Sequence, residues 1–389
     1  MSILLILIAL TLLVVIMVQI AKASELSEEI NDEPVHGEKQ SNIHGYLMLA
    51  FIIAGLIGVA YCFYHFKQFL FPVSASEHGK QLDFMFDITL IFTMAVFVPS
   101  QFVLFWFAFR YREKKDGVVK FFPHNNKLEM IWTIIPSIVL TVLVVLGIKT
   151  WLNIFDKAPE ESLVVEINAK QFQWVPRYAG EDGMLGERGI DFVMAFKDIN
   201  KDFNNELGIN WDDQNSFDDI VYPTEIHVLV NHPVVFKLHA LDVLHSFYLP
   251  FFRVKMDCVP GIPTQFWMKP TITTDSMRTI LKDHSYYWTE INPKTNKPRY
   301  ETFVYELACA ELCGKSHYNM RLPLYVDTEE QFAQWQSEQQ SHYEKVVAEQ
   351  LNRTIIKPEI PETISADSFQ ANISYPLENS SIQLTKHGK

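Results

Sequence analysis

The sequence is poor in cysteine and has no excess of positive charge. Only four of its 389 residues are cysteines, too few for a disulfide scaffold. The motif C-x-x-C-H does not occur, so the chain has no covalently attached haem c of its own. The formal net charge of −13 argues against nucleic acid as a partner and mildly favours a basic one. Two of the cysteines, Cys309 and Cys313, lie close together in the chain and need a separate explanation.

Long apolar runs are absent after about residue 152, although 48% of the chain is hydrophobic. Most acidic residues lie in that second part, so apolar and acidic residues are segregated along the chain. A transmembrane helix needs about 20 predominantly apolar residues. Four segments meet this requirement, and they begin at Ile3, Tyr46, Ile88 and Met130. We therefore predict a membrane protein with four N-terminal transmembrane helices.

The loop between the third and fourth segments predicts the orientation in the membrane. Its basic residues, which outnumber the acids Glu113 and Asp116, are Arg110, Arg112, Lys114, Lys115, Lys120 and Lys127. By the positive-inside rule this short loop is cytoplasmic, so everything after about residue 152 lies on the outer side. Counting the crossings backwards places Met1 outside.

The first segment has a second interpretation, because "AKA" at 21–23 resembles a signal-peptidase site. Cleavage there would leave the new N-terminus on the wrong side if the second segment spans the membrane. The segment also lacks the basic region that begins a signal peptide. We therefore favour a retained helix over a cleaved signal.

After Trp151 the pattern changes to short strand-like runs separated by turn residues, such as "SLVVEINAKQFQW" and "ETFVYELACA". Enrichment in β-branched and aromatic residues, with proline and glycine between the runs, predicts a β-sandwich or barrel. Two polar inserts, 180–221 and 273–300, interrupt it. A polar segment that follows predicts a surface helix capped by Asp327 or Thr328. The tail beyond Asn352 is expected to be largely disordered or docked on a partner.

The expected organisation has four parts. Residues 1–86 hold two extra transmembrane helices with linkers, and 87–152 form a transmembrane helical hairpin. Residues 153–327 form the outer β-domain with its inserts, and 328–389 form a surface helix with an extended C-terminal tail.

The stretch "CAELCGKSHYNM" concentrates metal-binding side chains, with the spacing C-x-E-x-C-x3-H-x2-M. Cys309, Cys313, His317 and Met320 could share one face of a helix, or the two cysteines could form a disulfide. The preceding "TFVYEL" is strand-like, which argues against the helix. A disulfide would leave the histidine and the methionine unexplained, so we favour a metal site.

The donor types indicate copper. Thiolate, imidazole and thioether together suit copper, whereas zinc sites are built from cysteine, histidine and carboxylate ligands. A mononuclear blue-copper site uses one cysteine, so a second thiolate favours two coppers that share two bridging sulfurs. Such a pair needs another imidazole, and "DVLHSFYLP" offers His245, with His239 and His232 as less favoured alternatives.

Several motifs in order resemble subunit II of haem-copper cytochrome c oxidase. They are "FAFRYREKK" with "NNKLEMIWTIIP" for the helical hairpin, "AKQFQW", "DVLHSFYLP" with "KMDCVPG", and the cysteine stretch. The resemblance runs from the third apolar segment to about Val326. It implies a cupredoxin-like outer domain in a multi-pass protein of a bacterial-type inner (plasma) membrane, with that domain on the periplasmic side.

The resemblance also implies the ligands, partners and reaction. The binuclear centre called CuA would be held by His245, Cys309, Cys313, His317, Met320 and the carbonyl of Glu311. The carboxylate of Glu311 would reach a magnesium ion at the interface with subunit I. The centre would accept electrons from cytochrome c, or from a complex that bears it, and pass them to haem in subunit I. The chain would be an enzyme only within the oxidase complex, which reduces O2 to water and pumps protons.

Three further residues receive roles from the resemblance. Glu129 matches a carboxylate near the start of a proton pathway into subunit I, although a carboxylate at a helix N-terminus is favourable in any case. The family has a surface aromatic through which the electron enters, and Phe172 stands at that position. Trp174 matches a second aromatic of the motif and is the first choice here, with a core aromatic as its alternative.

Two other functions explain the sequence less well. A quinol oxidase subunit II has the same hairpin and fold but lacks the copper ligands, all of which are present here. In a stand-alone copper-binding or copper-delivery protein, Glu129 and Glu311 would have no function, because the roles assigned to both residues require contact with a subunit I.

Overall fold

The computed structural model describes residues 2–30, 37–114, 117–118, 121–189, 191–192 and 205–347. The chain divides into two compact units. One comprises 1–67 and 88–139, and the other comprises 68–87 with everything from residue 140 onwards. The C-terminal tail, for which disorder or docking is expected, lies outside the described residues.

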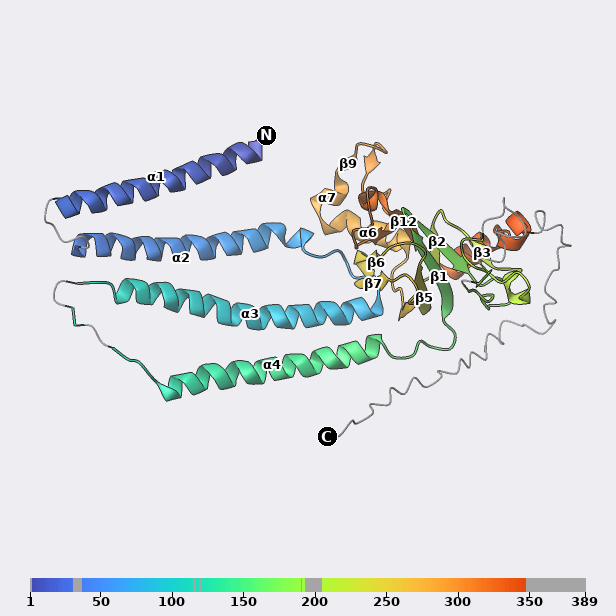
Figure 1. Cartoon of the computed structure of the whole chain (residues 1–389), viewed down its shortest axis with the longest axis horizontal. Helices are drawn as coiled ribbons and strands as arrows, with labels where there is room; N and C mark the ends of the chain where they lie inside the picture. Colours follow the sequence, from blue (N-terminus) through green and yellow to red (C-terminus); the bar gives the residue numbers. More distant parts are fainter. Residues whose placement is uncertain are drawn as a thin grey trace. The chain divides into compact units, whose positions relative to one another are not determined.

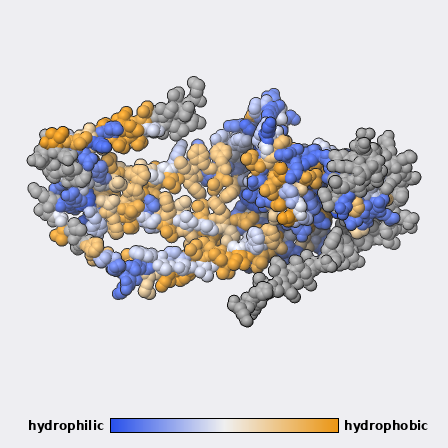
Figure 2. Space-filling model, in the orientation of Figure 1, coloured by the Kyte–Doolittle hydropathy of each residue, from blue (hydrophilic) through white to orange (hydrophobic). Residues whose placement is uncertain are grey.

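Four long helices are built from the apolar segments: α1 (Ser2–Ile30), α2 (Glu38–Phe66), α3 (Glu77–Arg110) and α4 (Asn126–Ile154) (Figure 1). Within the described part of the chain, three segments are long and apolar enough to cross a membrane: Glu38–Phe69, Glu77–Arg110 and Asn126–Ile154. Hydrophobic side chains cover the surfaces of α2, α3 and α4 (Figure 2). The first apolar segment is helical, as expected, and its crossing of the membrane stays a prediction.

Two five-stranded sheets form the core of the second unit. One has the order β3-β2-β1-β5-β8, with β1 (Leu163–Lys170), β2 (Gln173–Tyr178), β3 (Ile220–Val221), β5 (Val234–Ala240) and β8 (Thr264–Met268). The other has the order β4-β12-β11-β6-β7, with β4 (Ile226–Leu229), β6 (His245–Leu249), β7 (Val254–Cys258), β11 (Tyr305–Cys309) and β12 (Arg321–Asp327). Strand β1 is parallel to β5 and β4 is parallel to β12, and the remaining pairs are antiparallel.

The two sheets face each other across an aromatic core. Phe247 on β6 packs against Phe236 on β5 and Phe266 on β8, with ring centroids 5.1 and 5.5 Å apart. Along β5, Val234, Phe236 and Leu238 are buried while the residues between them are only partly so. This period of two is what a strand with one face on the core requires. The expected β-sandwich after N-terminal apolar helices is therefore confirmed.

The segment that leads into α3 belongs to the β-unit. Ala75 is fully buried in the core, its N–H donates to the carbonyl of Phe251 (2.8 Å), and its carbonyl accepts from Thr271 (2.8 Å). Arg253 adds a two-pronged ion pair to Asp83 on α3, with Nε–Oδ1 at 2.8 Å and Nη2–Oδ2 at 3.0 Å. The start of α3 is thus fixed to the sandwich by packing and by charge.

The first insert covers β2 through a buried ionic cluster. Arg177 has no exposed surface and pairs with Asp219 and with Glu166, the latter at 3.2 Å. Arg188 also reaches Glu166 (3.1 Å). Burial and the neighbouring Asp218 raise the pKa of Asp219 to about 7, against the influence of Arg177. Glu166 has more cationic neighbours, and despite its burial its pKa lies below the ordinary value.

The second insert forms α6 (Thr274–His284), α7 (Tyr286–Thr289) and the hairpin of β9 (Ile291–Asn292) and β10 (Lys297–Pro298). The helix expected after the last strand is α8 (Glu329–Ser337), and Thr328 caps it through a capping box with Gln331. Helix α8 ends at Ser337, before the end of the polar segment that was expected to be helical. A single π-helical turn follows at Tyr343–Val347. Phe332 and Trp335 on α8 are buried, so this helix packs on the sandwich rather than lying free on its surface.

Candidate metal centre

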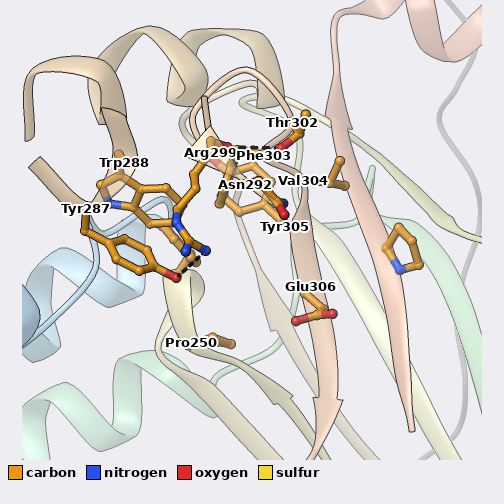
Figure 3. A pocket seen from close by; sticks show the side chains of 12 residues that line it. Pro250, Tyr287, Trp288, Asn292, Arg299, Thr302, Phe303, Val304, Tyr305 and Glu306 are labelled. Atoms are coloured by element: carbon orange, nitrogen blue, oxygen red, sulfur yellow. Dashed lines mark hydrogen bonds between the residues drawn. The ribbon is translucent and has the colours of Figure 1, made fainter. Parts of the chain in front are cut away.

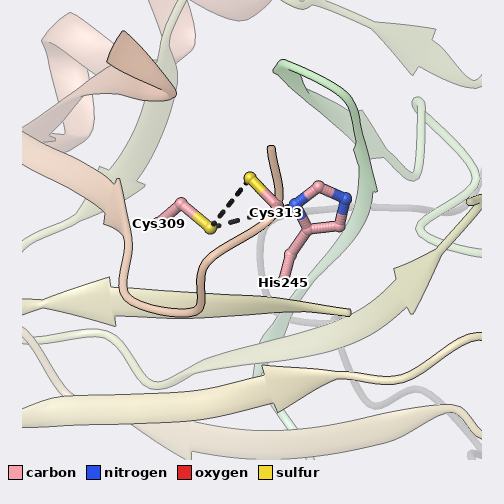
Figure 4. A group of neighbouring side chains, drawn as sticks. All are labelled: His245, Cys309 and Cys313. Atoms are coloured by element: carbon pink, nitrogen blue, oxygen red, sulfur yellow. Dashed lines mark hydrogen bonds between the residues drawn. The ribbon is translucent and has the colours of Figure 1, made fainter. Parts of the chain in front are cut away.

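The strand order brings His245 and the cysteine stretch together. His245 begins β6 and Cys309 ends β11, and these strands are antiparallel neighbours in one sheet. One ligand atom each from His245, Cys309 and Cys313 lies within 4.8 Å of the others, a group that could hold a metal ion (Figure 4). The Cys309 Sγ atom is 3.8 Å from both His245 Nδ1 and Cys313 Sγ.

The remaining expected donors adjoin this group. His317 Nδ1 lies 3.6 Å from Cys313 Sγ, and Met320 Sδ lies 3.8 Å from the same sulfur. The carbonyl oxygen of Glu311 is 3.2 Å from Cys309 Sγ. All six donors expected from the sequence are therefore in one place, although residues 245 and 309 are far apart in the chain.

Both alternative interpretations of the cysteine stretch disagree with this geometry. The stretch is the end of β11, a loop and the single 3-10 turn His317–Asn319, so its donors do not share the face of an α-helix. The two cysteines are free thiols. Their sulfur atoms are much farther apart than the roughly 2.05 Å of a disulfide bond.

Backbone hydrogen bonds fix the loop that carries the donors. Ala310 N–H donates to Ser246 O (3.0 Å), and Cys309 N–H donates to Met320 O (3.1 Å). Gly314 has a φ of +133°, and a Cβ atom there would lie only 2.9 Å from Cζ of Phe172. The loop therefore depends on glycine for both its backbone conformation and its close approach to the "AKQFQW" motif.

A second layer of residues holds the donors in place. Asp242 Oδ1 lies 2.8 Å from His245 Nε2, and its Oδ2 accepts from the backbone N–H of Gln171 (2.7 Å). The side-chain amide of Gln171 donates to Cys313 O (2.5 Å). Neither residue was predicted from the sequence. Asp242 could have been, because it lies three positions before His245 and metal-binding histidines commonly form a hydrogen bond to a carboxylate.

The electrostatics of the two thiols differ. Burial tends to raise the pKa of Cys309, but hydrogen bonding with His245 and the neighbouring backbone outweighs it and brings this pKa to about 6. Burial and the charge on Cys309 raise the pKa of Cys313 to about 11. Two thiolates at this separation repel each other, so a positive ion between them would stabilise the pair.

The aromatic residues of "AKQFQW" occupy different depths. Trp174 is 1% exposed, its Nε1–H donates to Met320 O (3.3 Å), and its ring centroid is 6.1 Å from that of His245. Phe172 is only partly buried and packs beside the Gly314 loop. Trp174 is therefore a core residue in contact with the donors, whereas Phe172 is partly exposed beside the loop that carries them.

Glu129 lies in the other unit, at the start of α4. Its Oε1 accepts from the backbone N–H of Asn125 (3.3 Å), and Asn125 Oδ1 accepts from Leu128 N–H (3.1 Å). Glu129 thus takes part in capping the helix, as its position at a helix N-terminus suggests.

Comparisons with known proteins agree with the sequence motifs. Residues 64–149 match the family model described as "Cytochrome C oxidase subunit II, transmembrane domain". The alternative cytochrome c oxidase subunit 2 of Bradyrhizobium diazoefficiens is 29% identical over 296 residues, covering 76% of this chain and 93% of that protein. The chain is similar to cytochrome c oxidase subunit II proteins. The resemblance stated from the motifs is thereby confirmed.

Two further matches belong to the same family. The cytochrome c oxidase subunit 2 of Cereibacter sphaeroides is 26% identical over 272 residues, covering 68% of this chain and 78% of that protein. The solved periplasmic domain of subunit II of cytochrome oxidase from Bradyrhizobium japonicum is 22% identical, covering 46% of this chain and 95% of that one, with a TM-score of 0.28.

Proposed function

We propose that this chain is the electron-accepting subunit of a membrane cytochrome c oxidase and that it holds a binuclear copper centre of the CuA type. The observation that carries the proposal is the convergence of two thiols, two imidazoles, a thioether and a carbonyl at the ends of β6 and β11. The family relationship supports the same function.

The donor set fits copper better than its competitors. A structural zinc site prefers four cysteine or histidine ligands and has no use for a methionine sulfur. Blue-copper sites use a single cysteine, so the second cysteine favours a pair of metal ions bridged by sulfur. His245, Cys309, Cys313, His317, Met320 and the Glu311 carbonyl would hold the pair.

The protein's contribution is a rigid cage. A copper pair held there would take up and release one electron at a time. Donors mounted on two adjacent strands and a hydrogen-bonded loop change position little, which is what rapid electron transfer requires. Asp242 fixes the orientation of the His245 ring, and Gln171 fixes the carbonyl of Cys313.

The outer residues would connect the centre to its partners. Phe172 is the better placed of the two aromatics to receive an electron at the surface, because Trp174 is buried behind the donors. The exposed side chain of Glu311 would bind magnesium at the interface with subunit I. Glu129 would stand at the start of a proton pathway, and the β-unit would lie on the periplasmic side of the inner membrane.

The decisive experiment is metal loading of the full chain in detergent. Copper is added under mild reduction, bound metal is counted per chain, and optical and EPR spectra are recorded. The proposal expects two coppers per chain and a mixed-valence signal shared by both ions. One copper per chain, or a preference for zinc over copper, would overturn it.

Two histidine variants sharpen the result. His245→Asn should abolish the mixed-valence signal, whereas the matched control His232→Asn should leave it unchanged. Loss of the signal in the control alone would mean that the wrong histidine has been assigned. Oxidation of reduced cytochrome c by the assembled complex, absent in the His245 variant, tests the electron-accepting role separately.

A further inference from the structure

A cavity of about 370 Å³ lies at the second insert, away from the metal donors. Its walls come from α7, the β9–β10 hairpin, β11 and the turn after β6 (Figure 3). This volume is in the range of small-molecule and head-group sites. All of its lining residues belong to the β-unit, so the cavity is complete within one body.

Arg299 is the cationic group of this cavity. Its guanidinium stacks 4.5 Å above the ring of Tyr287, and Nη1 donates to the Tyr287 hydroxyl (3.4 Å). Its Nε atom is buried and has no hydrogen-bond partner among the described residues, with Glu290 Oε2 no closer than 3.9 Å. The cavity's one lining carboxylate, Glu306, pairs instead with Arg321 (3.1 Å). The Arg299 side chain as a whole is 30% exposed, so an anion in the cavity would meet a guanidinium that no described carboxylate approaches within hydrogen-bond distance.

The rest of the lining is mainly aromatic. Tyr287, Trp288 and Phe303 form one wall, and the indole ring of Trp288 packs edge-on against Phe303 at 5.6 Å. Such a surface combines an apolar body with polar tips, which suits a ligand that has both a charged and an apolar part.

Contacts with Phe69 connect the insert to the end of a candidate membrane span. Phe69 is the last residue of the candidate span Glu38–Phe69, and its ring packs edge-on against Tyr286 (5.9 Å) and Tyr287 (6.3 Å). Tyr286 and Ile291 are each more than half exposed. Tyrosine and tryptophan at the end of a span are characteristic of the lipid head-group level.

The insert is basic within an acidic chain. Residues 273–300 contain three acids, Asp275, Asp283 and Glu290, and five basic residues, Arg278, Lys282, Lys294, Lys297 and Arg299. The excess of two positive charges contrasts with the net charge of −13 for the whole chain. Local positive charge at a membrane surface attracts anionic lipids.

We propose that this cavity binds the head group of an anionic phospholipid, with Arg299 contacting the phosphate and the Tyr287–Trp288 wall covering the glycerol. The site is separate from the metal centre and does not depend on the proposed electron transfer. A lipid bound there would hold the second insert at the membrane surface. Strand β11 lines the cavity and ends at Cys309, so the lipid would hold this strand there as well.

The test uses the full chain, delipidated in detergent and titrated with phosphatidylglycerol, phosphatidylcholine or inorganic phosphate. Native mass spectrometry counts the lipid molecules retained. Wild type should retain one phosphatidylglycerol that phosphatidylcholine does not replace and that millimolar phosphate does not displace. Displacement by phosphate alone would show an anion site without lipid specificity and would overturn the lipid assignment.

Arg299→Gln should weaken retention by about tenfold or more, as expected when a charged hydrogen-bond donor is lost. The matched control Lys297→Gln removes the same charge from an exposed position on β10 that does not line the cavity, and should retain the lipid. Equal retention in both variants would overturn the proposal. Equal loss in both would show general charge attraction and overturn the specific site. Unfolding temperatures within a few degrees of wild type would show that both variants fold.

Discussion

His245 and Asp242 form a side-chain pair in which Nε2 and Oδ1 are 2.8 Å apart. The carboxylate accepts the Nε2–H, which leaves Nδ1 facing the Cys309 sulfur at 3.8 Å. The ring nitrogen that would bind a metal is thus chosen by a residue three positions earlier in the chain.

Asp242→Asn should lower copper affinity by about 10- to 100-fold, because the amide cannot hold the ring as the carboxylate does. Competition with a copper chelator measures this. Asp257→Asn, an exposed position on the neighbouring strand β7, is the matched control and should bind copper like wild type. Equal affinities for the two variants would contradict the role given to Asp242.

Gly314→Ala should distort the donor loop, since the new methyl group would lie 2.9 Å from the Phe172 ring at a φ that disfavours alanine. We expect a loss of about 1–3 kcal/mol in stability and an altered copper spectrum. Gly261→Ala is the control, because its φ is also positive (+75°) but no atom lies within 4 Å. It should cost about 1 kcal/mol and leave the spectrum unchanged.

Arg177→Met should destabilise the β-unit by about 3–5 kcal/mol, because the carboxylates of Glu166 and Asp219 would remain buried without their shared cation. Thermal unfolding of the full chain in detergent measures the change. Arg321→Met removes an exposed pair with Glu306 and should cost less than about 1 kcal/mol. Similar losses in both variants would mean that the buried cluster contributes little.

His342 should make the stability depend on pH between about 6.5 and 4. Burial, with Arg177 and Lys345 nearby, lowers the pKa of His342 to about 4, below the ordinary value of 6.5. The unfolded chain therefore binds the proton first, so stability is full above pH 6.5 and falls as the pH drops towards 4. The loss should reach at most about 3 kcal/mol.

The variant His342→Asn isolates this effect from Asp219, whose raised pKa acts in the opposite direction over a similar range. The difference in stability between wild type and variant should shrink as the pH falls from 6.5 to 4. Trp211, whose ring lies 5.6 Å from His342, provides the fluorescence readout. A difference that is constant with pH would refute the prediction.

The local chemistry could be predicted from the sequence because it depends on residue type and spacing. Apolar length predicts the helices α2, α3 and α4, and alternation predicts strands such as β5. The spacing of donors from Cys309 to Met320 indicates a metal and its kind. The cap of α8 follows from Thr328 and Gln331 alone.

Only the tertiary structure shows the features that depend on contacts between residues far apart in the chain. It placed Asp242 and Gln171 behind the donors, buried Trp174 beside His245, and joined the start of α3 to the sandwich through Ala75 and Arg253. Burial and strand pairing between residues far apart in the chain produce these relationships, and periodicity carries no signal for them. The sequence by itself determined which side chains could bind copper, and the pairing of β6 with β11 decided that they meet.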